Sequence, residues 1–288
     1  MASPEIHSIP PPWTLKGDIY AFVFWTPRSQ AKDGLPSMAY SPLEGQSSYA
    51  KDQEALGGLS MLQLIRYTDS PVGPYDELIL VPGNFGYERE DGSGRRVRKK
   101  GAKITRIYVS QKYTCYNGRK NWNVPKHLAQ FTWTDNADGS TTVKVHPHDT
   151  TTTTDSISES ASPDPTPFFQ ATFKPIRYTP SFPFRTSWIN SLGFDTTLIL
   201  PPLPEGSGSQ GELPGTDRWC AVVPQQATSK CSLGWFDVAQ HRDDEGKVTG
   251  AFDNFWPGWS RWQIGIKMEN SVIEFGHPET WESPKTRL

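Results

Sequence analysis

Short runs of apolar, aromatic and β-branched residues, divided by turns rich in glycine and proline, recur along the 288 residues of the chain. The first run, Ile19 to Trp25, is dense in such residues, as is typical of a strand buried on both faces. Leu59 to Tyr67 alternates two sets of side chains, and Tyr75 to Val81 follows after the turn Pro71-Val72-Gly73-Pro74. These two runs are predicted to be neighbouring antiparallel strands.

The same pattern continues to the C-terminus. Ala129 to Thr134 and Thr141 to His146 flank Asn136-Ala137-Asp138-Gly139 and predict a hairpin. Glu88 to Lys103 predicts a second, charged hairpin. The remaining predicted strands are Lys103 to Ser110, Phe168 to Ile176, Thr196 to Leu200, Trp219 to Val223, Leu233 to Gln240 and Trp262 to Phe275. Because helical periods are few, the chain is predicted to be mainly antiparallel β.

Two segments without periodicity interrupt the strands. Thr26 to Lys51 is rich in proline, glycine and serine and is predicted to be a long irregular connection. Residues 149–167 form a Thr/Ser/Pro tract that predicts a flexible loop. Residues 1–14 are expected to be an N-terminal extension, and residues 15–288 a single domain. Five aromatic residues are expected to pack one end of a barrel, namely Phe252, Phe255, Trp256, Trp259 and Trp262.

Composition and charge narrow the classes of function. Hydrophobic residues make up 35% of the chain and charged residues 21%, as in an ordinary soluble protein with a sizeable core. The formal net charge of -2 gives no general attraction to nucleic acid or to anionic membranes. No run is long and apolar enough to span a membrane, and the N-terminus lacks the pattern of a secretory signal. We therefore expect a cytoplasmic protein whose partners are small molecules.

The cysteine, histidine and glycine patterns predict no cofactor. Cys115, Cys220 and Cys231 lack CxxC spacing, which indicates a reduced, intracellular protein without structural zinc. His146 and His148 lack a third ligand at a sensible spacing, so no metal site is expected. No Rossmann, P-loop, GxSxG or HExxH pattern is present, which disfavours nucleotide cofactors and zinc hydrolysis.

One lysine stands out because of its neighbours. In residues 118–128, Asn123 is predicted to cap a short helical turn, with Pro125 among its first residues and Lys126 held by the backbone. A desolvated lysine has a lowered pKa, and only the neutral amine attacks a carbonyl to form a Schiff base. The alternative is that Lys126 is a surface lysine on a helical turn.

A carboxylate also lies in an unusual place. Glu77 falls within the apolar run Tyr75 to Val81. Burying an unpaired carboxylate costs several kcal/mol, so Glu77 is expected to be paired, hydrogen-bonded or functional. Its neighbour Asp76 points to the opposite face of the predicted strand and is expected to be solvated.

These two stretches resemble motifs of the acetoacetate decarboxylase family. Asn117-Gly118-Arg119, followed by Pro125-Lys126-His127-Leu128-Ala129, resembles the family's Gly-Arg…Pro-Lys-Lys-Leu-Gly segment. Gly73-Pro74-Tyr75-Asp76-Glu77-Leu78 is similar to the strand that bears an active-site glutamate, and the resemblance covers roughly residues 15 to 275. It implies a double-layered, cone-like antiparallel β-barrel with few short helices, whose inner surface holds the lysine. Lys126 takes the position of the Schiff-base lysine, and Glu77 that of the pocket carboxylate.

The chain departs from the family pattern at both expected cations. His127 replaces the second lysine, and a largely neutral imidazole lowers the pKa of its neighbour less than an ammonium does. The family's early arginine has no counterpart in Lys16-Gly17-Asp18-Ile19-Tyr20. Nothing obvious then remains to hold the carboxylate of a small anion such as acetoacetate. The resemblance also implies ring-shaped homo-oligomers, of which the strand edges give no independent sign.

Three functions of different classes follow from these observations. The first is an enzyme that forms a Schiff base between Lys126 and a ketone or aldehyde, for decarboxylation, aldol or dehydration chemistry, with Glu77 and His127 assisting. The second is a noncovalent cyclase or isomerase, of pericyclic or Diels-Alder type, that reuses the same pocket. The third is a non-catalytic small-molecule binding protein. The expected substrate-binding residues are Tyr75, Arg119, Trp122, Phe22 and Tyr20.

Aromatic residues reach 12% of the chain and include 11 tryptophans. They are explained equally by a β-sheet core with cross-strand pairs and by a pocket lined for an apolar ligand. Together with the long loops, they fit an enzyme of specialised, fungal-type secondary metabolism.

Overall fold

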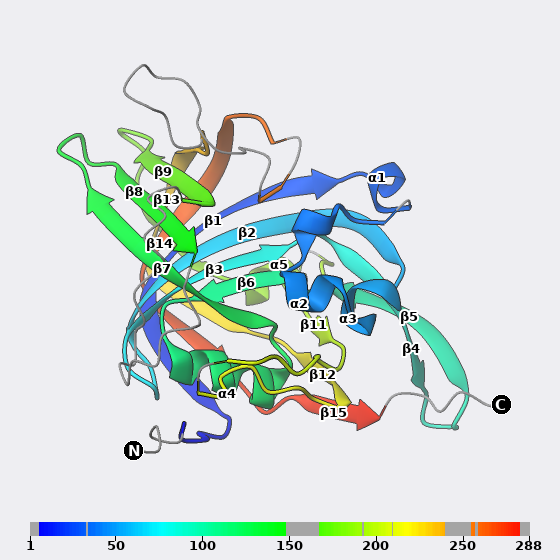
Figure 1. Ribbon diagram of the computed structural model, residues 1–288. Coiled ribbons are helices and arrows are strands. Elements are labelled where there is room, and N and C mark those ends of the chain that lie inside the picture. The colour runs from blue at the N-terminus through cyan, green and yellow to red at the C-terminus, as the bar shows by residue number, and fades with distance from the viewer. Residues whose placement is uncertain are drawn as a thin grey trace, which may run out of the picture.

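The protein is mainly β-sheet, with five short α-helices among the described residues (Figure 1). The computed structural model describes residues 6–32, 34–147, 167–191, 193–208, 210–239, 255–256 and 259–282. The strands are β1 (Trp13–Thr26), β2 (Ala55–Asp69), β3 (Tyr75–Val81), β4 (Asn84–Glu90), β5 (Arg96–Ala102), β6 (Arg106–Val109), β7 (Lys126–Asp135), β8 (Thr141–Pro147), β9 (Phe169–Pro175), β10 (Phe182–Arg185), β11 (Leu198–Leu200), β12 (Arg218–Val222), β13 (Gln225–Asp237), β14 (Trp262–Phe275) and β15 (Glu279–Glu282). The helices are α1 (Arg28–Lys32), η1 (Ser37–Ala39, a 3-10 turn), α2 (Pro42–Gly45), α3 (Ser48–Lys51), α4 (Lys112–Trp122) and α5 (Ser187–Ser191).

Nine strands close into a barrel. Their order is β1, β14, β13, β9, β8, β7, β6, β3 and β2, and the ring closes because β1 also pairs with β2. Every neighbouring pair in the ring is antiparallel except β6 and β7. The predicted antiparallel barrel is therefore confirmed, with one parallel pair that has consequences for the site.

A second layer continues from β2 through β4, β5, β11, β12 and β15. Together with α4, this layer lies along one side of the barrel (Figure 1). One core cluster lies between the two layers, because it joins Ile19 and Ile107 of the barrel to Leu200 and Val222 of the second layer. The double-layered architecture implied by the family resemblance is thus observed.

A second core cluster fills the barrel itself. Tyr20 of β1 lies 5.5 Å from Trp133 of β7 and 5.6 Å from Phe173 of β9, between ring centroids, although neither strand neighbours β1. These contacts must cross the barrel interior. Since successive side chains of a strand point to opposite faces, odd and even residues of β1 enter different clusters.

Several predicted strands match the structure closely. The β2/β3 pair, the charged β4/β5 hairpin and the β7/β8 hairpin are confirmed. The prediction of an irregular chain from Thr26 to Lys51 is wrong, because α1, η1, α2 and α3 lie there. The prediction also missed β10, β15 and the first half of β13. Residues 149–166 of the predicted loop, and Phe252 of the aromatic set, lie outside the described residues.

The N-terminal segment contacts the helix that precedes Lys126. The backbone N–H of Ile9 donates to Oδ1 of Asn117 at 2.7 Å, and Nδ2 of Asn121 donates to the Ile9 carbonyl at 2.8 Å. Trp13, which begins β1, is 3% exposed and packs edge-on against Trp122. Residues 6–13, expected to be an extension, therefore help to fix α4 against the barrel.

Candidate active site

α4 positions Lys126 at the start of β7. A tight turn can join only antiparallel strands, so the parallel pair β6/β7 needs a crossover, and α4 supplies it. Gln111 caps the N-terminus of this helix, and its side chain accepts a hydrogen bond from the Thr114 N–H at 3.0 Å. Asn123 ends the helix in the left-handed conformation, with φ of 55°, and donates from its N–H to the Arg119 carbonyl at 3.0 Å.

The predicted helical turn beginning at Asn123 is therefore wrong. Asparagine is favoured at a helix N-cap, but it is also one of the few residues that tolerates the left-handed C-terminal cap. Here it ends the longer helix α4, and Pro125 follows as a residue that cannot continue a helix. Lys126 is the first residue of a strand, held by backbone pairing to Ile107.

The Lys126 amine is buried among three polar side chains. Nζ lies 2.7 Å from Oε2 of Glu77 and donates to Oγ1 of Thr114 at 2.9 Å. It also lies 5.1 Å from the centroid of the Tyr75 ring, within the range of a cation-π contact. Lys126 is only 7% exposed, so these contacts act with little competition from solvent.

Glu77 is fully engaged on both oxygens. While Oε2 contacts Lys126, Oε1 accepts a hydrogen bond from the Tyr67 hydroxyl at 3.1 Å. Glu77 is 2% exposed, which confirms the expected burial of this carboxylate. Burial and the negative charge of Glu77 hold the pKa of Tyr67 well above its ordinary value, so Tyr67 stays a hydrogen-bond donor. Burial also raises the pKa of Tyr75 to about 12.

The pKa of Lys126 is raised, contrary to the prediction of a depressed value. Burial, the largest single effect, disfavours the charged amine, but the adjacent Glu77 carboxylate and the Tyr75 hydroxyl together outweigh it. The resting amine is therefore an ammonium paired with a carboxylate. A nucleophilic amine forms here only after a proton has left Lys126.

The Lys126 stem packs on a glycine of α4. A Cβ at Gly118 would lie 2.6 Å from Cδ and 2.7 Å from Cε of Lys126, closer than side-chain carbons approach one another. Glycine at this position therefore lets the lysine run flat against the helix and aims its amine at Glu77. This gives a physical reason for the glycine in the Gly-Arg part of the motif.

A small cavity of about 30 Å³ borders these groups. A water molecule takes up about 30 Å³ in the liquid, so the resting cavity has room for about one water. Its walls are mostly apolar, and Lys126 is the only cation among its lining residues. The lining is Trp13, Leu15, Tyr67, Tyr75, Glu77, Ile79, Ile104, Ile107, Gly118, Trp122, Val124, Lys126 and Phe275.

No protein-family model and no curated protein matches the sequence. Solved structures, in contrast, match over nearly the whole chain. An acetoacetate decarboxylase from Legionella pneumophila matches with a TM-score of 0.56 and 13% identity, over 95% of this chain and 88% of that one. The chain has the acetoacetate decarboxylase-like fold.

Two other proteins share this acetoacetate decarboxylase-like fold. An acetoacetate decarboxylase-like enzyme from Sphingomonas wittichii RW1 matches with a TM-score of 0.52 and 10% identity, over 95% of this chain and 94% of that one. The enduracididine biosynthesis enzyme MppR, complexed with the condensation product of pyruvate and imidazole 4-carboxaldehyde, matches with a TM-score of 0.51 and 14% identity, over 95% and 90%. At these identities the likeness extends to the fold.

Within this acetoacetate decarboxylase-like fold, the structure brings together four of the predicted site residues. Lys126, Glu77, Tyr75 and Trp122 all line the small cavity. The resemblance placed the lysine on the inner surface of the barrel, but the alternation of β7 puts it on the outer surface, between the two layers. Its backbone partner Ile107 belongs to the cluster that joins the barrel to the second layer.

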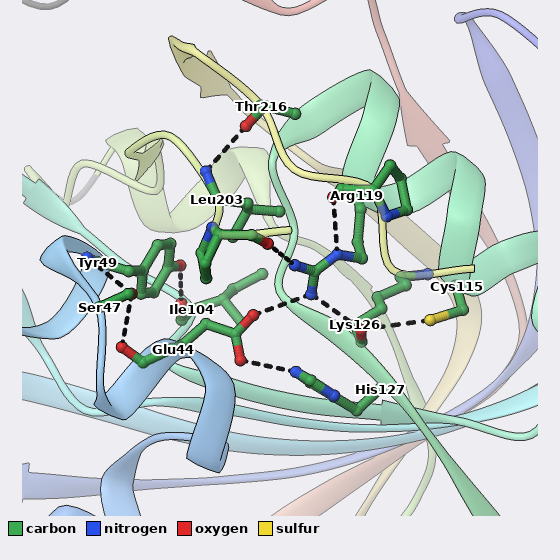
Figure 2. Close-up of polar contacts among 12 residues, drawn as sticks. Glu44, Ser47, Tyr49, Ile104, Cys115, Arg119, Lys126, His127, Leu203 and Thr216 are labelled. Carbon is green, nitrogen blue, oxygen red and sulfur yellow. Dashed lines mark hydrogen bonds and ion pairs between the residues drawn. The ribbon is translucent and has the colours of Figure 1, made fainter. Parts of the chain in front are cut away.

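His127 does not join the Lys126 site. As the next residue of a strand, it points to the opposite face, where its backbone partner Tyr108 belongs to the barrel interior. There Nε2 of His127 lies 2.6 Å from Oε2 of Glu44, a fully buried carboxylate of α2 (Figure 2). The predicted assistance of His127 to Lys126 therefore has no direct contact to support it.

Arg119, which was predicted to bind substrate, is fully buried, and its guanidinium is hydrogen-bonded to other groups of the protein. Nη1 donates to Oε1 of Glu44 at 2.9 Å and to the Lys126 carbonyl at 3.3 Å (Figure 2). Nε donates to the Pro214 carbonyl at 3.1 Å and Nη2 to the Pro204 carbonyl at 2.7 Å. The guanidinium thus positions the backbone behind Lys126 and does not line its cavity.

Tyr20 and Phe22 also lie apart from the Lys126 cavity. Both point into the barrel interior, where Phe22 packs 5.2 Å from Phe236 and 5.1 Å from Trp259, between ring centroids. Their expected contact with the substrate is therefore not at the Lys126 cavity and stays a prediction. Phe255 and Trp256 are buried in the same cluster and Trp259 packs against it, whereas Trp262 is 41% exposed, so only part of the predicted aromatic set packs the barrel.

Sequence reasoning missed Thr114, Tyr67 and Glu44. Thr114 and Gly118 are four residues apart, a spacing that places them on one helix face, but α4 itself was not predicted. Tyr67 pairs with Tyr75 across the β2/β3 register, which the predicted hairpin turn could have indicated. Glu44 lies in a segment predicted to be irregular, and no local signal identifies it.

Three remaining expectations concern metals, cysteines and membranes. Among the described residues, no group of three or more His, Cys, Asp or Glu side chains could hold a metal ion, and His148 lies outside them. Cys115, Cys220 and Cys231 are free, buried thiols, and burial raises the pKa of Cys115 to about 12. None of the described helices has the length and apolar character needed to cross a bilayer.

Proposed function

We propose that the protein is a cofactor-independent enzyme that acts on a small ketone or aldehyde through a Schiff base at Lys126. The observation that carries this proposal is the buried contact of 2.7 Å between the Lys126 amine and the Glu77 carboxylate at the wall of a cavity. A lysine amine is the nucleophile of Schiff-base catalysis, and a carboxylate within hydrogen-bond reach can move the required protons. Proteins of the same fold include an acetoacetate decarboxylase and MppR, which binds a carbonyl condensation product.

In the proposed reaction, Glu77 is the proton carrier. It accepts a proton from the Lys126 ammonium, and the neutral amine attacks the carbonyl carbon. The carbonyl oxygen takes a proton from the attacking nitrogen, giving a carbinolamine. Protonated Glu77 then donates to the carbinolamine hydroxyl, which leaves as water while the C=N bond forms. The resulting iminium is an electron sink for the carbanion produced by loss of a proton at the adjacent carbon.

The lining of the cavity supports a neutral, largely apolar substrate. Lys126 is its only cation, and that cation is already paired with Glu77. A substrate carboxylate would therefore find no free positive partner and would be repelled by Glu77. Since the resting cavity is only about 30 Å³, substrate entry requires the lining side chains to move.

Reductive trapping tests the proposal. The purified protein is incubated with simple diketones and apolar keto compounds, reduced with borohydride, and analysed by intact mass and peptide mapping. We expect one adduct, on Lys126, and none in Lys126→Ala. Lys120→Ala is the matched control, because Lys120 is an exposed lysine of α4 six residues away and its loss should leave trapping unchanged. Adducts spread over surface lysines, with none on Lys126 in folded protein, would overturn the Schiff-base assignment.

A noncovalent cyclase or isomerase is the second candidate, and the raised pKa of Lys126 favours it. An ammonium does not attack carbonyls, but it can donate a hydrogen bond to a substrate oxygen on which negative charge develops. In that case borohydride traps nothing, and Lys126→Arg, which retains a donor, keeps more activity than Lys126→Ala. Tight binding of a ligand that is never converted would instead support the non-catalytic binding protein.

A further inference from the structure

A second cavity opens beside the start of β7, where the His127 side chain points. Its volume is about 240 Å³, room for roughly eight water molecules at about 30 Å³ each. His127, Tyr108 and Ser41 line it together with the apolar side chains of Leu128, Phe168 and Leu213. Lys126 and Glu77 are absent from this lining, so the cavity is separate from the candidate active site.

A buried ion-pair network fixes the tautomer of His127. Oε1 of Glu44 accepts from Arg119 at 2.9 Å, while Oε2 lies 2.6 Å from Nε2 of His127 (Figure 2). Burial opposes ionisation of Glu44, yet His127 and Arg119 together hold its pKa below the ordinary value, so it is a carboxylate that can only accept. Nε2 of His127 must then carry a hydrogen, and whenever the ring is neutral, as the site proposed below requires, Nδ1 is left as an acceptor.

The Ser41 hydroxyl is buried without a partner. Ser41 is the N-cap residue of α2, a position where serine usually accepts a hydrogen bond from the helix backbone. Here its side chain makes no capping bond, and Oγ has no hydrogen-bond partner among the described residues although Ser41 is 0% exposed. A buried hydroxyl without a partner is destabilising, and a ligand that pairs with it relieves that cost.

The other residues that line the cavity determine the shape and polarity of the ligand that fits it. Tyr108 and Phe168 lie 4.7 Å apart between ring centroids, and Leu128 and Leu213 complete an apolar surface. Glu212 also lines the cavity, and the Glu44 carboxylate lies behind His127. Arg119 balances the charge of Glu44, but Glu212 and the lack of any lysine or arginine in the lining disfavour an anion, so the fitting ligand is neutral, apolar over most of its surface and polar at one point.

We propose that this cavity is a second binding site, for a small neutral phenol. The phenol hydroxyl donates to Nδ1 of His127 and accepts from the Ser41 hydroxyl, which reaches it by rotation about χ1. The aromatic ring packs against Phe168 and the neighbouring leucines. The site is independent of any reaction at Lys126, and it gives His127 a role that its distance from the lysine pocket otherwise leaves open.

Calorimetric titration of the full chain with phenol tests this site, with toluene as a probe that lacks the hydroxyl. We expect phenol to bind at least tenfold more tightly than toluene, and Ser41→Ala and His127→Leu each to weaken phenol binding at least tenfold. Lys126→Ala should bind phenol as the wild type does. Equal binding of phenol and toluene, or loss of phenol binding in Lys126→Ala, would overturn the assignment.

A second measurement guards against misfolding of the His127 variant, which leaves Glu44 without one partner. Ser41→Ala removes only an unpaired hydroxyl, so it should fold at least as well as the wild type. Imidazole ¹⁵N NMR of the wild type should show the Nε2–H tautomer and a shift of Nδ1 when phenol is added. An Nδ1 resonance unchanged at saturating phenol would contradict the proposal even if every variant folds.

Discussion

Lys126 and His127 are neighbours in the chain, yet their side chains leave opposite faces of β7 and meet different carboxylates. Lys126 contacts Glu77 at 2.7 Å between the two layers, and His127 contacts Glu44 at 2.6 Å toward the barrel interior. The charged side chain in direct contact with the Lys126 amine is therefore Glu77, and neither His127 nor Glu44 touches this amine. A change at position 127 reaches Lys126 only through the backbone and through Arg119, which donates to both Glu44 and the Lys126 carbonyl.

Glu77→Gln is expected to lower the pKa of Lys126. The Glu77 carboxylate is the largest of the effects that raise this pKa against burial, so without it burial is opposed only by smaller effects such as that of Tyr75 and favours the neutral amine. NMR of reductively ¹³C-methylated protein would follow the titration of Lys126 directly. We expect its midpoint to fall below the ordinary lysine value in Glu77→Gln, while exposed Lys120 titrates unchanged.

The same variant should lose stability. Removing one partner of a buried ion pair typically costs about 3–5 kcal/mol, because the other charge is left unpaired. Urea unfolding at neutral pH measures this loss. Glu77→Leu combined with Lys126→Met removes both charges and should recover most of it. If the pKa of Lys126 is higher in Glu77→Gln than in the wild type, then Glu77 is not the charge that controls the pKa of Lys126.

Gly118→Ala is expected to displace the lysine. Its new Cβ would lie 2.6 Å from Cδ of Lys126, so the side chain must leave its path along α4 and its amine must move away from Glu77. Overpacking of this kind costs about 1–3 kcal/mol, which exceeds the gain of up to about 1 kcal/mol from alanine in a helix. Borohydride trapping at Lys126 should fall at least tenfold.

Gly45→Ala in α2 is the matched control for that substitution. Its Cβ would lie 3.5 Å from Cβ of Tyr40, an ordinary contact, so stability and trapping should stay near those of the wild type. If Gly118→Ala also retains full trapping and stability, then the flat path of the lysine along α4 has no role in holding its amine at Glu77.

The lysine–glutamate contact was foreseeable from sequence, because two short motifs and one buried acid pointed to the same pocket. The face on which each residue lies was not. Lys126 was placed on a helical turn, whereas in a strand residues 126 and 127 must separate. To decide between a helical turn and a strand at Lys126, one must know that α4 ends at Asn123. The sequence does not show this, because asparagine is compatible both with the start and with the end of a helix.

Glu44 shows a second limit of sequence reasoning. It lies 75 residues from Arg119 and 83 residues from His127, so no local periodicity connects them. Its helix α2 has only four residues, too short to give a helical pattern. The buried contacts of Glu44 with Arg119 and His127 therefore arise from tertiary packing, and no local sequence pattern predicts them. The periodicity of the barrel strands is local, so it can be recognised in the sequence.

Asp76→Asn is expected to stabilise the protein at neutral pH. Asp76 was predicted to be solvated but is half-buried, and its Oδ1 accepts a hydrogen bond from Nε1 of Trp133 at 2.9 Å. Burial raises the pKa of Asp76 from 3.8 to about 6, although the Trp133 bond and Arg66 oppose it. The folded state thus binds the proton more tightly than the unfolded state, and stability falls as pH rises from about 4 to 6.

Asparagine keeps the acceptor for Trp133 and removes the charge. At pH 7 the variant should gain up to about 3 kcal/mol of unfolding free energy over the wild type, the linkage equivalent of that pKa change. Below pH 3.8 the difference should vanish, because Asp76 is then protonated in both states. Urea unfolding at both pH values measures it, and a stability difference independent of pH would contradict the raised pKa.

Arg119→Lys is expected to destabilise the fold without touching the chemistry. Lysine is a point donor and cannot reproduce a planar fork that reaches Glu44 and the carbonyls of Pro204, Pro214 and Lys126 together. Because lysine keeps the charge that pairs with Glu44 but leaves buried carbonyl acceptors without a donor, we expect a loss of about 1–3 kcal/mol in urea unfolding. The fraction that stays folded should still be trapped by borohydride at Lys126 with unchanged dependence on ketone concentration. Wild-type stability with weaker ketone binding would instead restore Arg119 to the substrate-binding role predicted from sequence.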